Sequence, residues 1–306
     1  MEKLAKLKTI TRGKFLAREP MSRHTTYGIG GPVLAYIVPK DVDDLATVLR
    51  FTREENIPIF FAGSGSNLLV SDSGYDGLVI SLEKTFDKLN FEGPKVTVEA
   101  GVKLVKLVKE TIKRKLSGLE GLVGVPGTVG GALKMNAGAF GNEISTMLIN
   151  LTVMTLQGTV KTYQRGELIF NYRYSSIPDD EIIVSALLQL EPSDVETIQS
   201  RWSKASQDRK TSQPLKVRSA GSVFKNPTEG KAAGYLIDQA GLKGTRVGDV
   251  EISAKHANFF FNRGNAKAVD MVALIRLAQD KVYEKFGIKL ELEIKTLGFK
   301  SGALDQ

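Results

Sequence analysis

Short apolar runs separated by amphipathic stretches organise the first part of the chain. Residues 33–38 (VLAYIV) predict a buried strand, and Asp41 is placed to begin a helix that ends near residues 55–56. Pro58 opens a second apolar strand, so residues 33–63 predict a βαβ unit. The apolar face of the helix is expected to hold Val42, Leu45, Leu49 and residues beside Phe51.

The pattern changes towards strands and hairpins further along the chain. Residues 95–100 alternate as a half-buried strand, and a helix follows whose apolar face is separated from its lysines. Residues 147–155 and 159–163 flank Gln157-Gly158 and predict a hairpin, and residues 182–190 predict a further strand. The apolar face of the helix holds Leu104, Val105, Val108 and Ile112.

A new pattern after residue 192 predicts a domain boundary. Pro192 and a capping box formed by Ser193 and Glu196 begin a helix that runs to about Arg209. Both sides of this boundary mix helices with closely spaced strands, so the predicted fold class is α+β. Beyond the boundary we expect a helix at 232–241, strands at 248–252 and 257–262, a helix at 266–286 and a last strand at 288–298. The apolar stripe of the long helix is Met271, Val272, Ile275, Ala278, Val282 and Phe286, with Gly287 at its end.

The composition is that of a globular protein of about two domains. The chain has 306 residues, of which 42% are hydrophobic and 25% are charged, and a domain holds about 150 residues. Its apolar runs are far shorter than the roughly 20 residues that span a bilayer, and residues 1–20 lack the apolar segment of a signal peptide. We therefore expect a cytoplasmic protein without membrane insertion and without an obligatory protein partner.

The side chains available for chemistry are restricted. The chain has no Cys, which excludes disulfides, cysteine-ligated zinc, thiolate nucleophiles and iron–sulfur clusters. With only His24 and His256 present, we predict no metal site. Any reaction must use carboxylates, hydroxyls, Arg, Lys, backbone amides or a bound cofactor.

Charge and glycine are both unevenly distributed. The net charge is +8, and residues 201–231 alone contribute +6. Such a segment can meet nucleic acid, an anionic membrane or a phosphorylated ligand. Eight of the 30 glycines lie between residues 118 and 141, a density that favours backbone held close to a phosphate.

Two Gly-rich segments are candidates for this phosphate site. Gly63-Ser64-Gly65-Ser66-Asn67 follows a predicted strand, but the residues after it do not open a helix, so it is not a Rossmann fingerprint. It also lacks the Gly-Lys-Ser/Thr of a P-loop and fits a tight turn as well as a phosphate site. The second segment, 124–139, holds too many glycines to predict a good helix or strand, and its apolar residues argue against a mobile surface loop. Together the two segments suggest an extended dinucleotide held between two lobes.

Several motifs together resemble a known family. Gly28-Ile29-Gly30-Gly31-Pro32, GSGSN and GVPGTVGGALKMNAGAFG resemble the FAD-binding domain of the vanillyl-alcohol-oxidase type. The motifs NYRYSS, SAGSVFKNP, AGYLIDQAGLKG, ISAKHANF and LELEI narrow the resemblance to the UDP-N-acetylenolpyruvoylglucosamine reductases, over nearly the whole chain. The resemblance implies a two-lobed FAD-binding domain over 1–197, with lobes of about 1–80 and 81–197, and a substrate-binding domain over 198–306.

The resemblance also implies roles for individual residues. Arg173 matches the family's catalytic Arg, Ser222 its proton-donating Ser and Glu293 its C-terminal Glu, while Lys225 and Asn226 match contacts to the UDP-sugar. Taken singly, these could be ordinary surface, turn or strand residues; the linked motifs favour the catalytic interpretation. The residues expected to hold a non-covalent FAD are Gly63, Ser64, Gly65, Ser66, Asn67, Gly124, Pro126, Gly127, Thr128, Gly130, Gly131, Ala132, Asn136 and Gly138.

The implied reaction explains why these residue types are needed. Reduction of an enolpyruvyl ether by NADPH through FAD leaves negative charge at C2 and in the carboxylate, which Arg173 and Glu293 would stabilise. Ser222 would protonate C2. The product would be UDP-N-acetylmuramate, and the basic segment 201–231 would suit the diphosphate of the substrate and the phosphate of NADPH.

The chain departs from the family pattern in one place, and its residues disfavour two other functions. The short interval of 27 residues between Arg173 and Arg201 resembles the type II subtype, but Lys210 replaces an Arg expected beside Arg209. An FAD oxidase of the same superfamily acting on another sugar or alcohol is disfavoured, because no Cys or His lies in the Gly-rich segments to attach flavin covalently. A nucleic-acid-binding protein is disfavoured because Trp202 is the only aromatic residue between 201 and 223.

Overall fold

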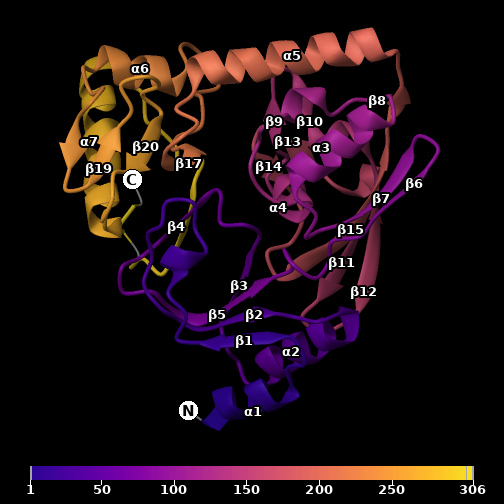
Figure 1. The fold of residues 1–306 in the computed structure, drawn as a ribbon. Coiled ribbons are helices and arrows are strands. Elements are labelled where there is room, and N and C mark those ends of the chain that lie inside the picture. Colours follow the sequence, from indigo (N-terminus) through magenta and orange to yellow (C-terminus); the bar gives the residue numbers. More distant parts are fainter. Residues whose placement is uncertain (1, 301, 305–306) are drawn as a thin grey trace. The chain divides into compact units, whose positions relative to one another are not determined.

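The computed structural model describes residues 2–300 and 302–304, which form two compact units (Figure 1). The first unit contains residues up to 17, 34–64 and 77–209, and the second contains 18–33, 65–76 and the residues from 210 onward. Each unit has its own hydrophobic core. The units therefore interleave along the sequence, because two short N-terminal segments belong with the C-terminal part.

A four-stranded sheet of order β1-β2-β5-β3 contains the first strands of the chain. β1 pairs antiparallel with β2, and β3 pairs parallel with β5. The predicted strand–helix–strand succession over 33–63 is present, with β5 between its two strands. The elements are α1 (Glu2–Ile10), β1 (Lys14–Ala17), β2 (Val33–Val38), α2 (Val42–Glu54), β3 (Ile59–Ala62) and β5 (Tyr75–Ser81).

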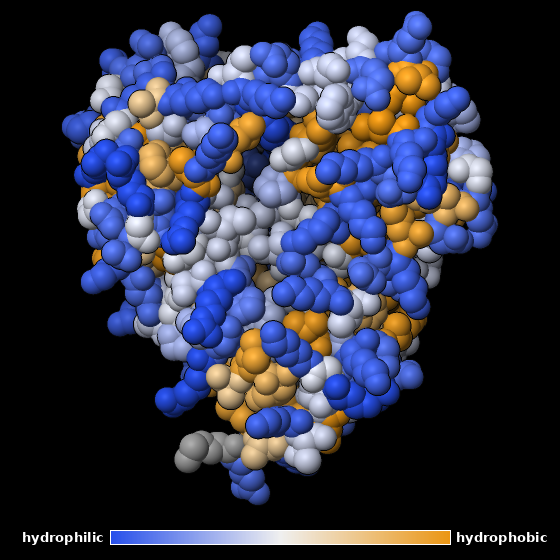
Figure 2. Space-filling view, viewed as in Figure 1, coloured by the Kyte–Doolittle hydropathy of each residue, from blue (hydrophilic) through white to orange (hydrophobic). Residues whose placement is uncertain are grey.

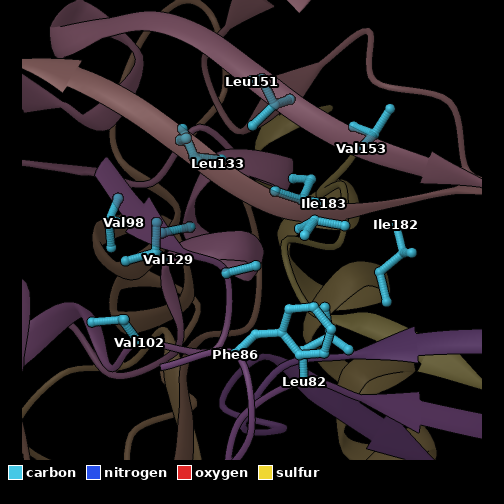
Figure 3. Close-up of a cluster of buried hydrophobic side chains, with 14 of the residues drawn as sticks. Leu82, Phe86, Val98, Val102, Val129, Leu133, Leu151, Val153, Ile182 and Ile183 are labelled. Carbon is cyan, nitrogen blue, oxygen red and sulfur yellow. The ribbon is translucent and has the colours of Figure 1, made fainter. Parts of the chain in front are cut away.

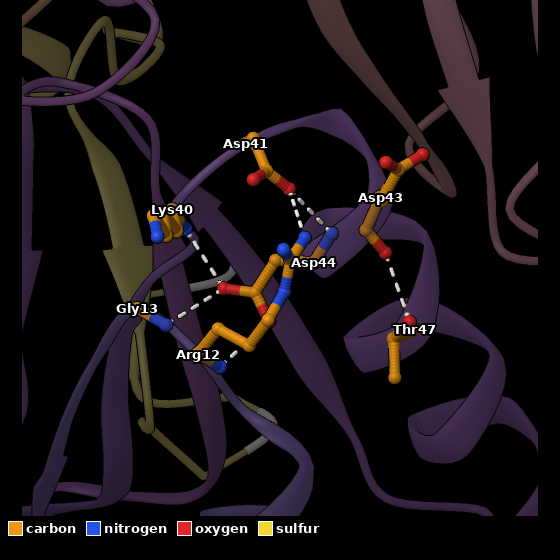
Figure 4. Close-up of polar contacts among 7 residues, drawn as sticks. All are labelled: Arg12, Gly13, Lys40, Asp41, Asp43, Asp44 and Thr47. Carbon is orange, nitrogen blue, oxygen red and sulfur yellow. Dashed lines mark hydrogen bonds and ion pairs between the residues drawn. The ribbon is translucent and has the colours of Figure 1, made fainter.

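A buried carboxylate fixes the chain around the start of α2 (Figure 4). Asp44 is 1% exposed, and its carboxylate accepts hydrogen bonds from the main-chain N–H groups of Arg12 (2.9 Å), Gly13 (2.8 Å) and Lys40 (2.7 Å). Asp41 caps the helix as predicted, accepting from the N–H of Asp44 at 2.9 Å. The prediction that Val42 belongs to the apolar face of this helix is wrong. Val42 is 41% exposed, because the buried face of the helix is formed by residues such as Leu45, Val48 and Leu49.

A five-stranded antiparallel sheet of order β12-β11-β15-β7-β6 forms the other half of the first unit. It confirms the strands predicted at 95–100 and 182–190 and the hairpin around Gln157-Gly158. The helix predicted after residue 103 is α3 (Leu104–Lys113), although Val105 and Ile112 are only half-buried. The strands are β6 (Leu89–Glu92), β7 (Lys95–Glu99), β11 (Leu148–Thr155), β12 (Val160–Gln164) and β15 (Glu181–Gln189).

The Gly-rich segment contains a helix, which corrects the prediction that it could form none. α4 (Val129–Lys134) begins after Thr128, whose side chain accepts from the N–H of Gly131 at 3.4 Å. Val129 and Leu133 project from this helix into the core beneath the five-stranded sheet (Figure 3). A Cβ on Gly130 would lie 2.9 Å from the Cβ of Ala100. The glycine therefore lets the helix approach the end of β7 closely, and burial of the apolar face offsets its low helix propensity.

Short elements complete the first unit, and the start of α5 needs a second correction. The cap of α5 is Asp194, which accepts from the N–H of Thr197 at 2.7 Å, and not the predicted Ser193–Glu196 box, because the helix begins one residue later. The longer helix α5 (Val195–Ser212) extends past residue 209, where the first unit ends. The short elements are β8 (Leu116–Ser117), β9 (Gly138–Ala139), β10 (Asn142–Glu143), β13 (Phe170–Asn171), β14 (Tyr174–Ser175), β16 (Glu191–Pro192) and the 3-10 helices at Glu120–Leu122, Ile144–Met147 and Arg165–Glu167.

The second unit packs two helices on a sheet of order β17-β20-β19-β18. Tyr27, Ile29 and Leu69, from the two N-terminal segments, are buried in its core. The last strand is shorter than predicted: only β21 is regular, and it pairs in parallel with β4. Residues 288–294 form no strand because their pairing is limited to a bridge between Phe224 and Leu292. The elements are η1 (Met21–Arg23), β4 (Leu68–Val70), β17 (Arg218–Ser222), α6 (Ala233–Gln239), β18 (Arg246–Val247), β19 (Val250–Ile252), β20 (Phe259–Asn262), α7 (Ala268–Phe286) and β21 (Lys295–Leu297).

Candidate active site

The first residue of the GSGSN segment lies against the second Gly-rich segment within the first unit. A Cβ built on Gly63, at the end of β3, would lie 2.7 Å from Oγ1 of Thr128. Among the described residues, no hydrogen bond uses the main-chain N–H groups of Ser64, Gly127 or Thr128. The segments therefore present uncommitted amide donors beside one another, the kind of group that binds a diphosphate.

The remaining predicted flavin residues are divided between the units. Gly124, Pro126, Gly130, Gly131, Ala132, Asn136 and Gly138 belong to the first unit, and Gly65, Ser66 and Asn67 belong to the second. Gly65 has φ +64°, and a Cβ there would lie 1.9 Å from the carbonyl oxygen of His24. Glycine is thus required at this position by the chain itself, whatever ligand is bound.

Arg173 lies in a tight turn with a left-handed backbone. It is the second of the two residues that join β13 to β14, and its φ is +56°. This conformation costs a non-glycine residue about 1 kcal/mol or more. The turn is held by Asn136, a fully buried residue whose Nδ2 donates to the carbonyl oxygen of Asn171 at 3.0 Å and to Oε2 of Glu143 at 2.8 Å. Asn136 therefore supports the Arg173 turn, a role that its place in a Gly-rich motif did not indicate.

Ser222 and Glu293 come from neighbouring segments of the second unit. The N–H of Glu293 donates to the carbonyl oxygen of Val223, and the N–H of Lys225 donates to that of Glu291, both at 2.8 Å. Ser222 follows an irregularity in the pairing of β17 with β20, at which Gly221 has φ +78°. Such a bulge re-aims the side chain that follows it. The structure thus brings two of the three predicted catalytic residues onto adjoining stretches of chain.

A buried asparagine that sequence reasoning passed over fixes the chain after Ser222. Asn258 is 2% exposed, its Oδ1 accepts from the N–H of Phe224 at 2.9 Å, and its Nδ2 donates to the carbonyl oxygen of Phe224 at 2.8 Å. Its place in the ISAKHANF motif was the only hint of its importance in the sequence. Its role could not be predicted from this motif, because it depends on contacts with the distant Phe224.

The two predicted UDP-sugar contacts already have partners within the chain. Nζ of Lys225 lies 3.3 Å from Oε2 of the exposed Glu291. Oδ1 of Asn226 accepts from the N–H of Ala233, at the start of α6, at 3.1 Å. Their roles toward a ligand stay predictions.

The basic residues of the segment 201–231 are divided between the two units. Nη1 of Arg201 donates to Oγ of Ser117 at 3.0 Å, and burial lowers the pKa of the Arg209 guanidinium. Further along, Lys216 and Arg218 line an open pocket of about 590 Å³ together with Arg263. These basic side chains therefore have different surroundings: Arg201 contacts the protein itself, and Lys216 and Arg218 line an open pocket.

Among the described residues, neither a membrane-spanning helix nor a metal-binding cluster is found. In the described part of the chain, no helix is long and apolar enough to cross a membrane, and the face in Figure 2 is mostly hydrophilic with separate apolar patches. The described residues also contain no group of three or more His, Asp and Glu side chains placed to hold a metal ion.

Comparison with known proteins identifies the two parts of the chain. One family model, an FAD binding domain, matches residues 33–164, and another, the C-terminal domain of UDP-N-acetylenolpyruvoylglucosamine reductase, matches residues 213–297. The FAD-binding domain and the mixture of helices and strands confirm the predicted α+β fold class. The free amides beside Gly63 and Thr128 fit the diphosphate of this cofactor.

Relatives that align with nearly the whole chain are reductases of the same name. Those of Syntrophus aciditrophicus and Caldanaerobacter subterraneus are 43% and 41% identical to it, over 95% and 96% of this chain and 95% and 98% of theirs. A crystal structure of the reductase from Thermus caldophilus matches with a TM-score of 0.80 and 38% identity, covering 94% of this chain and 99% of that one. These matches do not favour the alternative of an oxidase, and the chain belongs to the family of UDP-N-acetylenolpyruvoylglucosamine reductases, FAD-dependent oxidoreductases.

Proposed function

We propose that the chain reduces UDP-N-acetylglucosamine enolpyruvate to UDP-N-acetylmuramate, with NADPH as the source of electrons. The similarity to reductases over 95% of the chain carries this proposal. The reaction would supply a peptidoglycan precursor in the cytoplasm. In this assignment residues 1–197 bind FAD and residues 198–306 bind the UDP-sugar.

FAD, when bound, supplies hydride transfer between NADPH and C3 of the enolpyruvyl group. The chain's own contribution to FAD binding is the pair of adjoining segments at Gly63-Ser64 and Gly127-Thr128, whose amides would hold the diphosphate. The apolar residues of α4 keep the second segment anchored to the core.

Three side chains act on the substrate in this proposal. The planar guanidinium of Arg173 binds the enolpyruvyl carboxylate through two hydrogen bonds and stabilises the charge that develops there. The carboxyl group of Glu293 would stabilise the same charge, and Ser222 would transfer its hydroxyl proton to C2. The pairing of the chain at Val223 with that at Glu293 supports a shared role for these last two residues.

The two half-reactions separate these roles. With FAD-loaded protein and no oxygen, NADPH should bleach the flavin, and the enolpyruvyl substrate should restore its colour. Ser222→Ala should bleach normally and recover colour roughly 10²–10⁴-fold more slowly, the usual cost of a lost general acid. Ser73→Ala, at an exposed serine of the same unit, serves as the control and should recover like the parent.

Each failure has a distinct meaning. Normal recovery in Ser222→Ala would show that another group delivers the proton. Failure at the bleaching step would assign Ser222 to the nicotinamide site. Parent protein that bleaches with NADPH but never recovers with the enolpyruvyl substrate would contradict the proposed reaction itself.

A further inference from the structure

Asn67, the last residue of the GSGSN segment, is tied to the chain at Glu293. Its Nδ2 donates to the main-chain carbonyl oxygen of Glu293 at 3.0 Å, and its own carbonyl oxygen accepts from the N–H of Lys295 at 2.9 Å. The pairing continues directly into the parallel ladder of β4 and β21, which begins at Leu68 and Lys295. The side-chain bond therefore extends the ladder to Glu293, which lies outside the strand.

The opposite side of Glu293 is held by the segment that follows Ser222. Its N–H donates to the carbonyl oxygen of Val223 at 2.8 Å. Thus both peptide groups that flank the α-carbon of Glu293 are held. Val223 accepts from the one before it, and the one after it is bound by the side chain of Asn67 at 3.0 Å and by a longer bond, 3.4 Å, from the N–H of Ile294 to Val223. Because these peptide planes set the direction of the Cα–Cβ bond, they also set where the carboxyl group can reach.

We propose that Asn67 is a positioning residue for Glu293: its amide fixes the peptide after Glu293 and thereby aligns the carboxyl group with Ser222 and the substrate. The inference rests on the proposed function for the role of Glu293, and it assigns the Asn67 side chain to that residue and not to the flavin. A displacement of about 1 Å at a reacting group can lower a rate about 10²-fold. A residue that touches no substrate can therefore control the step that Glu293 serves.

Two variants test the side-chain bond to Glu293. Asn67→Ala removes it, and Asn67→Asp keeps the shape but places a carboxylate oxygen where a donor is needed. Both leave the main-chain bond from Lys295 in place. Ser73→Ala is the matched control. It removes a hydrogen bond of 2.9 Å between the hydroxyl groups of Ser71 and Ser73, in the same segment as Asn67 but not to Glu293.

The first measurement is hydrogen exchange in the FAD-loaded protein, which does not depend on turnover. In both Asn67 variants, the hydrogen-bonded N–H groups of Glu293, Ile294 and Lys295 should exchange at least about 10-fold faster, while Ser73→Ala leaves them unchanged. Unchanged exchange in the Asn67 variants would overturn the proposal, whatever the reaction of the enzyme.

The second measurement follows the half-reactions and the affinity for FAD. Asn67→Ala should recover colour with substrate about 10- to 100-fold more slowly, with bleaching by NADPH and the dissociation constant of FAD within about 3-fold of the parent. In a Glu293→Gln background the same substitution should cost less than about 3-fold, because the group that it aligns is already lost.

Different results separate the two claims. Weakened FAD binding with both half-reactions slowed would make Asn67 a flavin ligand and overturn the positioning role. A full additional loss in the Glu293→Gln background would overturn it as well. If Glu293→Gln alone recovers colour at the parental rate, the catalytic role of Glu293 is contradicted. An effect of Asn67 on the reaction through Glu293 is then contradicted as well.

Discussion

Arg173 occupies a position at which its backbone is less stable than that of glycine. Its φ of +56° lies in the left-handed region, which glycine adopts without cost. The buried Asn136 holds the turn in this conformation. Such a costly backbone conformation at an arginine is typical of a residue whose side chain is needed for function.

This conformation leads to a prediction that separates stability from activity. Arg173→Gly should be more stable to denaturant than Arg173→Ala by about 1 kcal/mol, although both should lose about 10²–10³-fold in turnover. At Arg114, where φ is −92°, the order of the glycine and alanine variants should reverse. Equal stability of the two Arg173 variants in urea titrations would contradict the account of the turn.

His256 is the residue whose protonation should weaken the fold. Burial lowers the pKa of its imidazole, and Nδ1 accepts the N–H of Asn258 at 3.3 Å, which requires the unprotonated ring nitrogen. Below the ordinary His pKa of about 6.5, the unfolded chain binds a proton that the folded chain does not. Stability is therefore complete above this pH and declines as the pH falls below it.

The measurement is the urea midpoint between pH 7.5 and pH 5.5. The parent should lose stability over this interval, and His256→Gln should lose less, since it has no proton to take up. From pH 7.5 to 8.5 both should be nearly constant. A slope that is the same in the variant and the parent would show that other groups cause the pH dependence.

At the scale of elements, α7 begins with a cap from a distant segment. The carboxylate of Asp72 accepts from the N–H groups of Ala268 (2.8 Å) and Val269 (3.0 Å), so the segment 65–76 stabilises a helix nearly 200 residues away. A carboxylate at this end of a helix also interacts favourably with its dipole.

Removal of this cap should have a measurable cost. Asp72→Ala should lower the free energy of unfolding by about 1–2 kcal/mol, the usual cost of a lost helix cap. Asp76→Ala removes an exposed carboxylate of the same segment and should change stability far less. Denaturant unfolding followed by circular dichroism provides the comparison, and equal losses would show that charge, not capping, is responsible.

Elements with strong local periodicity could be predicted from the sequence, and those that depend on distant contacts could not. The strand at 33–38, the hairpin around Gln157-Gly158 and the long helix ending at Gly287 all follow from local patterns. Helix α4 was missed because packing against the sheet outweighs its glycine content. Among the candidate site residues, the motifs pointed to Ser222 and Glu293, but the contacts of Asn67, Asn136 and Asn258 arise only when distant segments meet.

At the scale of the whole molecule, the second unit cannot be excised as one stretch of chain. Its core includes Tyr27, Ile29 and Leu69, and its strand β21 pairs with β4. Residues 198–306 alone would leave that core incomplete and that strand without its partner.

We therefore expect a fragment of residues 198–306 to lack cooperative unfolding. Addition of a fragment of residues 18–76 should restore structure, because it carries the missing core residues and β4. Circular dichroism during thermal melting measures both effects. A sharp transition in the fragment alone would show that the N-terminal segments contribute little.

The parallel pairing of β4 with β21 also determines when the protein can finish folding during its synthesis. Residues 68–70 leave the ribosome long before residues 295–297 exist. At the usual 5–20 residues per second, they remain without this partner for about 10–50 s. During that time a short apolar strand edge is open to pairing with other chains. We therefore expect newly made chains to depend on dilution or on chaperones until residues 295–297 emerge from the ribosome.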